Sequence, residues 1–285
     1  MIPVPFDYVR AGSVDEAVAA LAEHGDEAKV LAGGHSLLPL LKLRLADPAL
    51  LVDVGRIDEL RGVRDDGDAL VIGAATTHHD VIRDPLIREH CRVLADATAK
   101  VGDPQVRNRG TIGGSLAHGD AAADLPAVAV ALDAGLVAAG PRGRRTIRAT
   151  DFFRDYLQTA LEPDEVLVEV RVPKLTSQGW GHDYQKLSRV AQSWAIVGAC
   201  ALVRREDGQV AEARVGLTNM GTTPVRARAV EAVLSGAAAE PGALAAAAEH
   251  AADDTDPPAD LDAQPDYRAH LARVLVRRAL EAAIA

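Results

Sequence analysis

Two glycine-bearing stretches constrain this chain more than any other feature of it. The first, Ala-Gly-Gly-His-Ser at residues 32–36, directly follows an apolar run at 29–31, and the second, Gly-Thr-Ile-Gly-Gly-Ser, occupies residues 110–115. Because glycine lacks a side chain, a ligand can approach the backbone of such loops closely, and their successive N–H groups can hold anionic oxygens. Each stretch alone is also typical of an ordinary tight turn. Together they favour a site for a diphosphate.

The sequence lacks the common motifs that indicate a nucleotide-binding site or a catalytic residue. Neither glycine stretch fits G-x-G-x-x-G or G-x-x-x-x-G-K-[ST], so a dinucleotide would be held in another way. The chain has no G-x-S-x-G element, zinc signature or catalytic cysteine motif, and we expect no catalytic residue. The triplet His78-His79-Asp80 lacks a third ligand at helical spacing, so we expect no metal site.

Composition narrows the class of protein. With 48% apolar residues, the 285-residue chain can build the core of one large or two ordinary domains. Its net charge of −10 and scattered arginines argue against a nucleic-acid partner, which needs a clustered basic face. We find neither a secretory leader nor an apolar segment long enough for a membrane span, and we expect a cytoplasmic protein.

The cysteines bear on redox chemistry. Cys91 and Cys200 are solitary and lie in apolar patterns, which favours buried free thiols over a disulfide. Two cysteines cannot hold an iron–sulfur cluster that takes four thiolates. If electrons pass through such a cluster, it belongs to a partner.

Periodicity and capping signals predict an α+β chain. A capping box at 13–16 predicts a helix ending at Gly25, and Asp124 with Pro126 predicts another helix, with Asp124 as its N-cap. Strands are predicted at 29–31, 50–54, 69–74, 136–139, 145–148, 165–172, 183–187, 195–203 and 213–217. Further helices are predicted at 40–45, from 78, from 85 through 97, and at 225–234, 243–252 and 267–285. The best domain boundary is 174–179, and we expect helices to cover one face of the second sheet.

A resemblance adds to this pattern. Residues 32–45, 109–116 and 123–126 together resemble the FAD-binding medium subunit of the molybdenum hydroxylases, the group that includes aerobic carbon monoxide dehydrogenase and xanthine dehydrogenase. The resemblance implies a two-part FAD-binding domain of the p-cresol methylhydroxylase/vanillyl-alcohol oxidase type at 1–175, with parts at about 1–57 and 58–175. It implies a smaller α+β domain, an antiparallel sheet with helices, at 176–285.

The same resemblance implies the cofactor-binding residues. Two sets would contact the FAD diphosphate, with Lys29 and Leu37 flanking it: Ala32, Gly33, Gly34, His35 and Ser36 on one side, and Thr111, Gly113, Gly114 and Ser115 on the other. Leu31, Gly110 and Ala117 complete the candidate positions in these loops. Asp124 would bind the adenosine ribose, Leu167 would pack by the adenine or the ring system, and Lys186 would reach the flavin from the second domain.

The resemblance also implies a function. The chain would hold FAD noncovalently, take electrons from a [2Fe–2S] partner subunit and pass them to an external acceptor. The molybdenum cofactor would lie in a large subunit and the [2Fe–2S] centres in a small one, in a dimer of heterotrimers. Two alternatives stay open: a self-sufficient FAD-dependent oxidase or reductase of the same flavin fold, and a non-redox assembly module that has lost FAD.

Three residues have an ordinary structural interpretation beside the functional one. Asp124 is also explained as a helix N-cap, and Lys186 as a surface lysine on an edge strand. Trp194 could shield the exposed flavin face or serve as a core anchor. For His35 we infer only a backbone contact, without proton chemistry at its ring.

Overall fold

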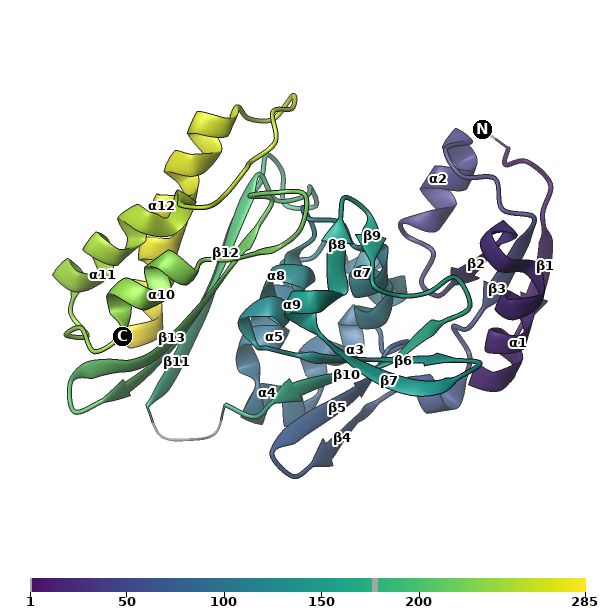
Figure 1. The fold of residues 1–285 in the computed structure, drawn as a ribbon, viewed down its shortest axis with the longest axis horizontal. Coiled ribbons are helices and arrows are strands. Elements are labelled where there is room, and N and C mark those ends of the chain that lie inside the picture. Colours follow the sequence, from purple (N-terminus) through teal and green to yellow (C-terminus); the bar gives the residue numbers. More distant parts are fainter. Residues whose placement is uncertain (1, 176–178) are drawn as a thin grey trace.

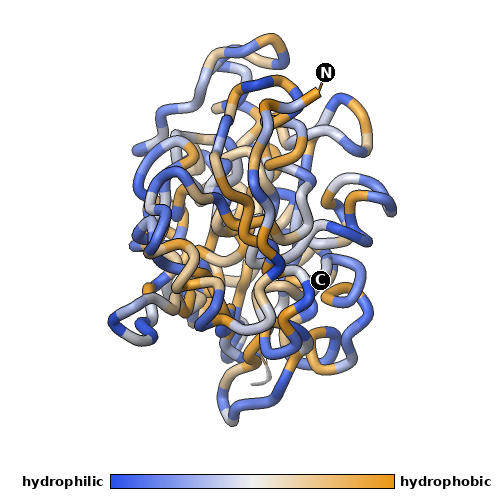
Figure 2. Tube along the Cα trace, turned by 90° about the vertical axis from the view of Figure 1, so that its right-hand side faces the viewer, coloured by the Kyte–Doolittle hydropathy of each residue, from blue (hydrophilic) through white to orange (hydrophobic). Residues whose placement is uncertain are grey.

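The computed structural model describes residues 2–175 and 179–285, and Figure 1 shows them as an N-terminal, a central and a C-terminal unit of sheet and helices, arranged in chain order from one end of the molecule to the other. Figure 2 views the molecule from the end that carries the N-terminal strand and shows hydrophilic segments mostly in the outer loops. The expected boundary at 174–179 falls partly on residues 176–178, which lie outside the described residues.

A small parallel sheet forms the N-terminal unit, with strand order β1-β3-β2. Its elements are β1 (Asp7–Arg10), α1 (Val14–His24), β2 (Ala28–Leu31), α2 (Leu37–Leu43) and β3 (Leu50–Asp53). The Ser13 hydroxyl accepts the Glu16 N–H as predicted, but the Glu16 carboxylate accepts the Gly12 N–H in place of that of Ser13, so only half of the capping box forms. Helix α1 ends at Gly25 with φ of 55°. Helix α2 begins three residues earlier than the predicted 40–45, so the first glycine loop connects β2 to a helix directly. The strand before it was predicted to be buried, but only Ala28 of β2 is.

An antiparallel sheet of order β4-β5-β10-β6-β7 forms the centre. Its strands are β4 (Val63–Asp66), β5 (Ala69–Gly73), β6 (Gly135–Gly140), β7 (Gly143–Arg148) and β10 (Val166–Pro173), and a two-stranded ribbon of β8 (Phe153–Asp155) and β9 (Gln158–Thr159) lies beside it. Strand β10 comes last in sequence yet pairs with both β5 and β6. The central sheet therefore closes only when the end of this region folds back between its earlier strands.

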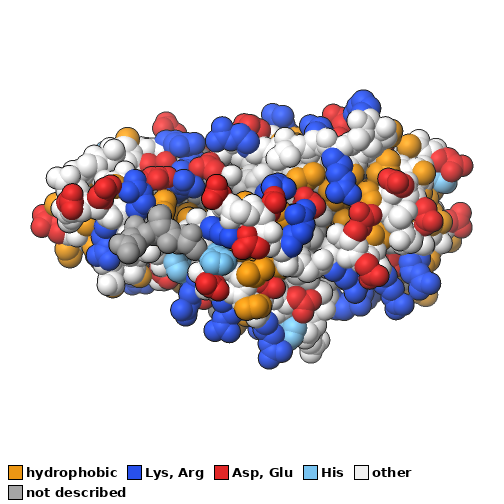
Figure 3. Space-filling model, turned by 90° about the horizontal axis from the view of Figure 1, so that it is seen from below, with side chains coloured by type: hydrophobic (Ala, Val, Ile, Leu, Met, Phe, Trp, Pro, Cys, Tyr) orange, Lys and Arg blue, Asp and Glu red, His pale blue; other side chains and the backbone are white. Residues whose placement is uncertain are grey.

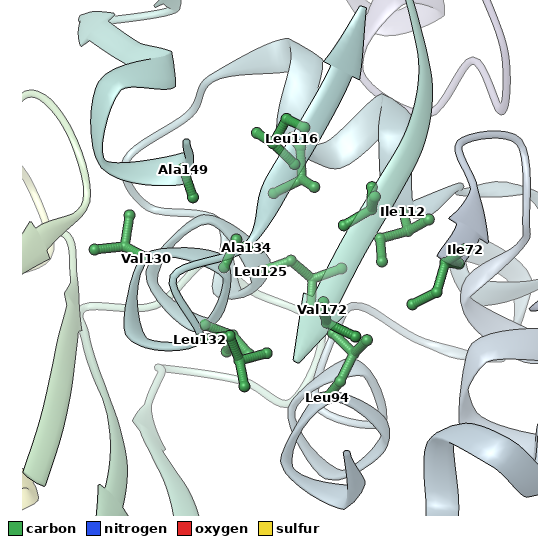
Figure 4. Close-up of a cluster of buried hydrophobic side chains, with 14 of the residues drawn as sticks. Ile72, Leu94, Ile112, Leu116, Leu125, Val130, Leu132, Ala134, Ala149 and Val172 are labelled. Carbon is green, nitrogen blue, oxygen red and sulfur yellow. The ribbon is translucent and has the colours of Figure 1, made fainter. Parts of the chain in front are cut away.

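Short helices cover this central sheet. They are α3 (His78–Arg83), α4 (Pro85–His90), α5 (Arg92–Thr98), α6 (Pro104–Arg109), α7 (Ile112–His118), α8 (Asp124–Ala131) and α9 (Ala149–Phe152). Figure 4 shows apolar side chains of α5, α7 and α8, among them Leu94, Leu116 and Leu125, packed against this sheet, to which Val172 of β10 belongs. The single helix predicted from 85 through 97 is wrong, because the backbone breaks at Cys91 (φ −149°, ψ 53°). Helix α6 had no prediction.

The C-terminal unit is an antiparallel sheet of order β11-β12-β13-β14. It comprises β11 (Trp180–Leu187), β12 (Val197–Glu206), β13 (Gln209–Thr218), β14 (Val225–Arg226), α10 (Arg228–Leu234), α11 (Pro241–Ala248) and α12 (Pro265–Ile284). The predicted helix at 225–234 is wrong in its first residues, since Val225 and Arg226 pair with β13. The predicted strand at 195–203 starts too early, because β12 begins at Val197.

Strand β12 is buried on both faces, which sets the position of the C-terminal sheet. Val197, Ala199 and Ala201 pack into the core formed with the C-terminal helices, whereas the intervening Cys200 and Leu202 join the core of the central unit. Helix α12 lies on the outer face of the sheet in Figure 1, and α8 on the inner face. We expected helices on one face only, but α8 from the preceding unit covers the second.

Two glycines allow these helices to approach the sheet closely. A Cβ added at Gly181 would lie 1.7 Å from the Ala283 carbonyl oxygen of α12, and one at Gly216 would lie 2.2 Å from the Ala127 carbonyl oxygen of α8. No side chain fits at either distance. The contact between α8 and the C-terminal sheet therefore depends on glycine at position 216.

Figure 3 shows acidic and basic side chains interspersed over the face of the molecule seen from below.

Among the helices of the described residues, none combines the length and the apolar character that a membrane crossing requires.

The change Gly216→Ala tests the close packing of α8. The added Cβ would force α8 away from β13, and we expect a loss of about 1–3 kcal/mol in the free energy of unfolding. The matched control is Gly242→Ala, in helix α11, where an added Cβ meets nothing within 4 Å. It should keep or raise stability by up to about 1 kcal/mol, because alanine favours the helix. Urea unfolding measures both, and equal stability of Gly216→Ala and the parent chain would contradict the close packing.

Candidate functional site

A cleft of about 610 Å³ runs between the three units and is bordered by both glycine loops. All but one of the predicted cofactor-binding residues lie on its wall, from the N-terminal, central and C-terminal units alike. The exception is Leu31, which lies beneath the first loop, where its side chain is 3.3 Å from the position of a Cβ added at Gly34. The cleft therefore brings together segments that are far apart in sequence.

The two glycine loops touch each other through their backbones. A Cβ added at Gly33 would lie 2.2 Å from the Arg109 carbonyl oxygen, so only glycine fits there. The second loop is itself attached to the start of α3, since the His78 N–H donates to the Gly110 carbonyl oxygen at 2.9 Å and Thr77 forms a bridge with Thr111. The loops therefore form one continuous rim of the cleft.

The first loop offers free backbone donors. No N–H group of residues 32–37 donates to another residue within the part of the chain that the structure describes. Gly34 adopts a φ of +77°, which favours glycine and turns the chain into α2. Consecutive unpaired N–H groups on a concave rim are suited to anionic oxygens.

The second loop differs, because most of its N–H groups are already used. Gly113 donates to the Ala74 carbonyl oxygen at 2.8 Å, Gly114 to the Thr111 hydroxyl at 3.0 Å, and Ser115 to the Thr111 carbonyl oxygen at 3.0 Å. The hydroxyl proton of Thr111 stays available because this oxygen accepts the Gly114 N–H. This loop can therefore contribute mainly hydroxyl groups and close backbone approach.

Asp124 and Lys186 meet each other across the boundary between the units. The Lys186 ammonium donates to Asp124 Oδ2 at 2.9 Å, and the Tyr184 hydroxyl donates to Asp124 Oδ1 at 2.7 Å. Asp124 is the first residue of α8, but the N-cap is Ala123 and no side-chain cap forms, so the predicted capping role of Asp124 is wrong. The surface interpretation of Lys186 is wrong too, because its side chain is only 5% exposed although β11 is an edge strand.

Burial is the largest influence on the pKa values of Asp124 and Tyr184. Desolvation raises the pKa of the Asp124 carboxyl above its usual value, although the Lys186 charge and the two hydrogen bonds act in the opposite direction. Desolvation and then the Asp124 charge raise the pKa of the Tyr184 hydroxyl well above its ordinary range. Each Asp124 oxygen keeps a further acceptor site that a ligand hydroxyl in the cleft could use.

Trp194 lies on the cleft wall and is 55% exposed, so the interpretation as a core anchor is wrong. The segment that carries it is fixed from the C-terminal unit. The Asn219 amide donates to the Ala195 carbonyl oxygen at 2.8 Å, and the buried Arg268 guanidinium donates to the carbonyl oxygen of Ile196. An indole held beside an open cleft can cover a planar ligand. His35 lies on the same wall and is exposed.

The His78-His79-Asp80 triplet turns out to be a helix start. Thr77 caps α3 by accepting the Asp80 N–H, and the Thr77 hydroxyl donates to the Asp80 carboxylate at 2.7 Å. His79 pairs with Arg83 at 3.2 Å, while His78 points inward. The described residues contain no group of three or more His, Cys, Asp or Glu side chains arranged to hold a metal ion.

His78 lines the cleft, although the sequence drew attention to it only as a possible metal ligand in the His78-His79-Asp80 triplet. It is 3% exposed, and its Nδ1 has no hydrogen-bond partner among the described residues. Burial, followed by the charge of Arg107, lowers the pKa of His78 to about 4. The ring is therefore neutral at physiological pH and packs against Gly110, whose glycine leaves room for it. Neither the His-His-Asp triplet nor its place directly after the cap of α3 indicated that it borders the cleft.

Part of the unpredicted wall comes from the end of β9 and the segment after it. The cleft is bordered there by Thr159, Leu161, Glu162, Pro163, Glu165 and Val166. Arg145 fixes this segment by donating to Glu165 at 2.7 Å and to the Ala160 carbonyl oxygen at 2.7 Å. Nothing in the sequence of this loop marked it as part of a site.

Comparison with known proteins gives full-length matches. Residues 4–175 match the protein family described as "FAD binding domain in molybdopterin dehydrogenase", and residues 182–283 match the family described as "CO dehydrogenase flavoprotein C-terminal domain". The carbon monoxide dehydrogenase medium chain of Hydrogenophaga pseudoflava is 45% identical over 283 residues, covering 99% of this chain and 98% of that protein.

A second relative and a solved structure also match this chain over nearly its whole length. The 6-hydroxypseudooxynicotine dehydrogenase complex subunit alpha of Paenarthrobacter nicotinovorans is 39% identical over 285 residues, covering 100% of this chain and 96% of that protein. A solved structure of carbon monoxide dehydrogenase from Hydrogenophaga pseudoflava, which lacks the Mo-pyranopterin moiety of the molybdenum cofactor, superposes with a TM-score of 0.97 at 47% identity, covering 99% of this chain and 98% of that one.

The buried His78 should make the free energy of unfolding depend on pH. An unfolded histidine binds a proton near pH 6.5 and the folded one only near 4, so the folded state loses stability as the pH falls below neutral. We expect this histidine to account for about 2 kcal/mol of the stability lost between about pH 7.5 and pH 5. Urea unfolding of His78→Gln should show a correspondingly smaller loss, whereas His270→Gln, at an exposed position of α12, should follow the parent chain. A loss in His78→Gln as large as that of the parent would show that His78 is not buried in neutral form.

Proposed function

We propose an electron-transfer role for this chain on the premise that it belongs to the FAD-binding medium subunits of the molybdenum hydroxylases, of carbon monoxide dehydrogenase and xanthine dehydrogenase type. The structural observation that carries the proposal is the meeting of two glycine loops on one cleft, with the N–H groups of residues 32–37 free to bind an anion.

The cleft residues fit FAD on chemical grounds. Glycine at 33 keeps the loops in contact, and the free N–H groups beside it suit a diphosphate. The volume of about 610 Å³ lies in the range of sites for cofactors and other small molecules. Leu167 and Ala117 add apolar surface, and Asp124 and Lys186 add a fixed charge pair at one end.

We assign roles to the wall residues accordingly. The backbone of Ala32, Gly33, Gly34, His35, Ser36 and Leu37 would hold one side of the diphosphate. The Thr111 and Ser115 hydroxyls would serve the other side, where Gly110, Gly113 and Gly114 permit close approach. Lys29 and Leu167 would flank the cofactor, Asp124 would accept from the ribose, and Lys186 would favour negative charge on the flavin.

The bound isoalloxazine ring would supply the redox chemistry, so this chain needs no acid–base or nucleophilic residue. We propose that electrons arrive from a [2Fe–2S] partner subunit and leave to an external acceptor, while substrate is oxidised at a molybdenum cofactor in a large subunit. The name "medium chain" of the Hydrogenophaga relative supports a complex with larger and smaller chains. We propose a dimer of heterotrimers.

Two further assignments accompany this proposal. We propose an FAD-binding domain at 1–175, with parts at about 1–57 and 58–175, and a flavoprotein domain at 176–285, supported by the separate matches at 4–175 and 182–283. We also propose a cytoplasmic location. The support is that Cys91 and Cys200 are both buried free thiols, as expected in a reducing compartment, and burial raises the pKa of Cys91 to about 12.

Flavin spectroscopy tests the function. The purified chain, mixed with FAD, should show the visible bands of bound flavin, and acid precipitation should release the flavin because it is noncovalent. Reduced [2Fe–2S] protein of the complex should bleach these bands. Absence of flavin bands after FAD addition would reject the proposal. Bleaching by an organic substrate without any partner would instead favour the self-sufficient oxidase or reductase.

Substitutions at Ser36 test whether the N–H groups of the first glycine loop bind FAD. Ser36→Pro removes one free N–H at a residue whose φ of −95° is close to the range of proline, and Ser36→Ala removes only the hydroxyl. A hydrogen bond to a charged group contributes about 1.5–3 kcal/mol, so Ser36→Pro should weaken FAD binding about ten- to hundredfold. Fluorescence titration with FAD measures the dissociation constants. Ser36→Ala should bind FAD more tightly than Ser36→Pro, and equal affinities would exclude a role for the Ser36 N–H.

A further inference from the structure

Tyr184 is buried beside the cleft although its hydroxyl is not part of the cleft wall. It lies two residues before Lys186 on β11, so both side chains leave the strand on the same face. Both donate to Asp124, one to each carboxylate oxygen, at 2.7 Å from Tyr184 and 2.9 Å from Lys186. The three side chains thus form one buried network between the C-terminal sheet and α8.

The side chain of Lys100 helps to hold the Tyr184 ring in place. The Lys100 ammonium lies 5.6 Å from the centre of the Tyr184 ring and donates to the Tyr184 carbonyl oxygen. In return, the Lys186 ammonium donates to the Lys100 carbonyl oxygen at 3.1 Å. Lysines from two different units thereby fix the strand that carries Tyr184 against the end of α5.

Gly198 supplies the space for the hydroxyl. It pairs with Lys186 in the sheet, and a Cβ at this position would lie 2.7 Å from the Tyr184 hydroxyl oxygen. Glycine weakens a strand interior, and here it leaves room for a polar atom. The Thr218 hydroxyl, 3.5 Å away, is the other polar group within reach of Tyr184.

The Asp124 carboxylate needs both donors. It is 4% exposed, and a buried charge that loses a hydrogen-bond partner is poorly compensated. Without the tyrosine hydroxyl, Asp124 would keep Lys186 as its one side-chain partner among the described residues, so the carboxylate would draw more strongly on that ammonium. Less positive charge would then be available to a group bound in the cleft.

We propose that Tyr184 is a positioning residue that, through its hydrogen bond to Asp124, holds the Lys186 ammonium at the cleft wall and so sets the reduction potential of the bound flavin. This inference rests on the proposed function, since it requires FAD in the cleft. Tyr184 touches no cofactor itself and acts through Asp124 and Lys186.

The change Tyr184→Phe tests this role in the FAD-loaded full chain by dye-equilibrated reductive titration. Reduced flavin carries more negative charge than oxidised flavin, so it depends more on the positive charge of Lys186. In Tyr184→Phe the ratio of reduced to oxidised flavin at a given potential should therefore fall about tenfold. For a two-electron couple this lowers the midpoint potential by about 30 mV. Tyr267→Phe, at a 48% exposed position of α12, is the matched control and should leave the potential unchanged.

A double variant separates positioning from a general packing role. Lys186→Gln should lower the potential, and adding Tyr184→Phe to it should cause no further shift, because both changes act on one network. Additive shifts would overturn the proposal, as would an unchanged potential in Tyr184→Phe. If Tyr184→Phe fails to fold, Gly198→Ala approaches the same hydroxyl from β12, and it should lower the potential as well.

The outcomes distinguish this inference from the proposed function. If the parent chain binds no FAD, the proposed function fails and the titration has no flavin to measure. If the parent binds FAD but Tyr184→Phe has the parental potential, only the positioning role is wrong.

Discussion

The site depends on one backbone contact, the approach of Gly33 to the carbonyl group of Arg109. Any side chain at position 33 would collide with that group, so glycine there decides whether the two loops can form a single rim. The contact joins the N-terminal parallel unit to the central antiparallel unit, which otherwise have separate sheets. The position of the cleft follows from it, because both loops border the same space.

The two loops contribute differently although their sequences look alike. The N–H groups of residues 32–37 donate to no other described residue, whereas those of Gly113, Gly114 and Ser115 are used in starting α7 and attaching it to Ala74, the residue after β5. A ligand diphosphate would therefore take most of its backbone hydrogen bonds from the first loop. The glycines of the second loop serve close packing as well, since a Cβ at Gly113 would lie 2.4 Å from that of Ala74.

Much of the fold could be predicted from local signals, and the failures have physical causes. The Ser13 N-cap of α1 depends on neighbouring residues, so the sequence reveals it. The Asp124–Lys186 pair depends on how α8 meets β11, which no local pattern encodes. The burial of His78 beside the cleft and the Arg145–Glu165 contact became visible only with the fold. The family resemblance named Asp124 and Lys186, but it did not indicate that they bind each other.

The central claim is that one cleft, built where the loops meet, holds the FAD diphosphate, with its charged end set by Asp124 and Lys186. A crystal structure of the chain with FAD measures this most directly. We predict pyrophosphate oxygens within hydrogen-bond distance of N–H groups in residues 32–37 and of the Thr111 or Ser115 hydroxyl, with the flavin on the side of Lys186. A pyrophosphate bound away from both loops, or held by one loop alone, would contradict the account.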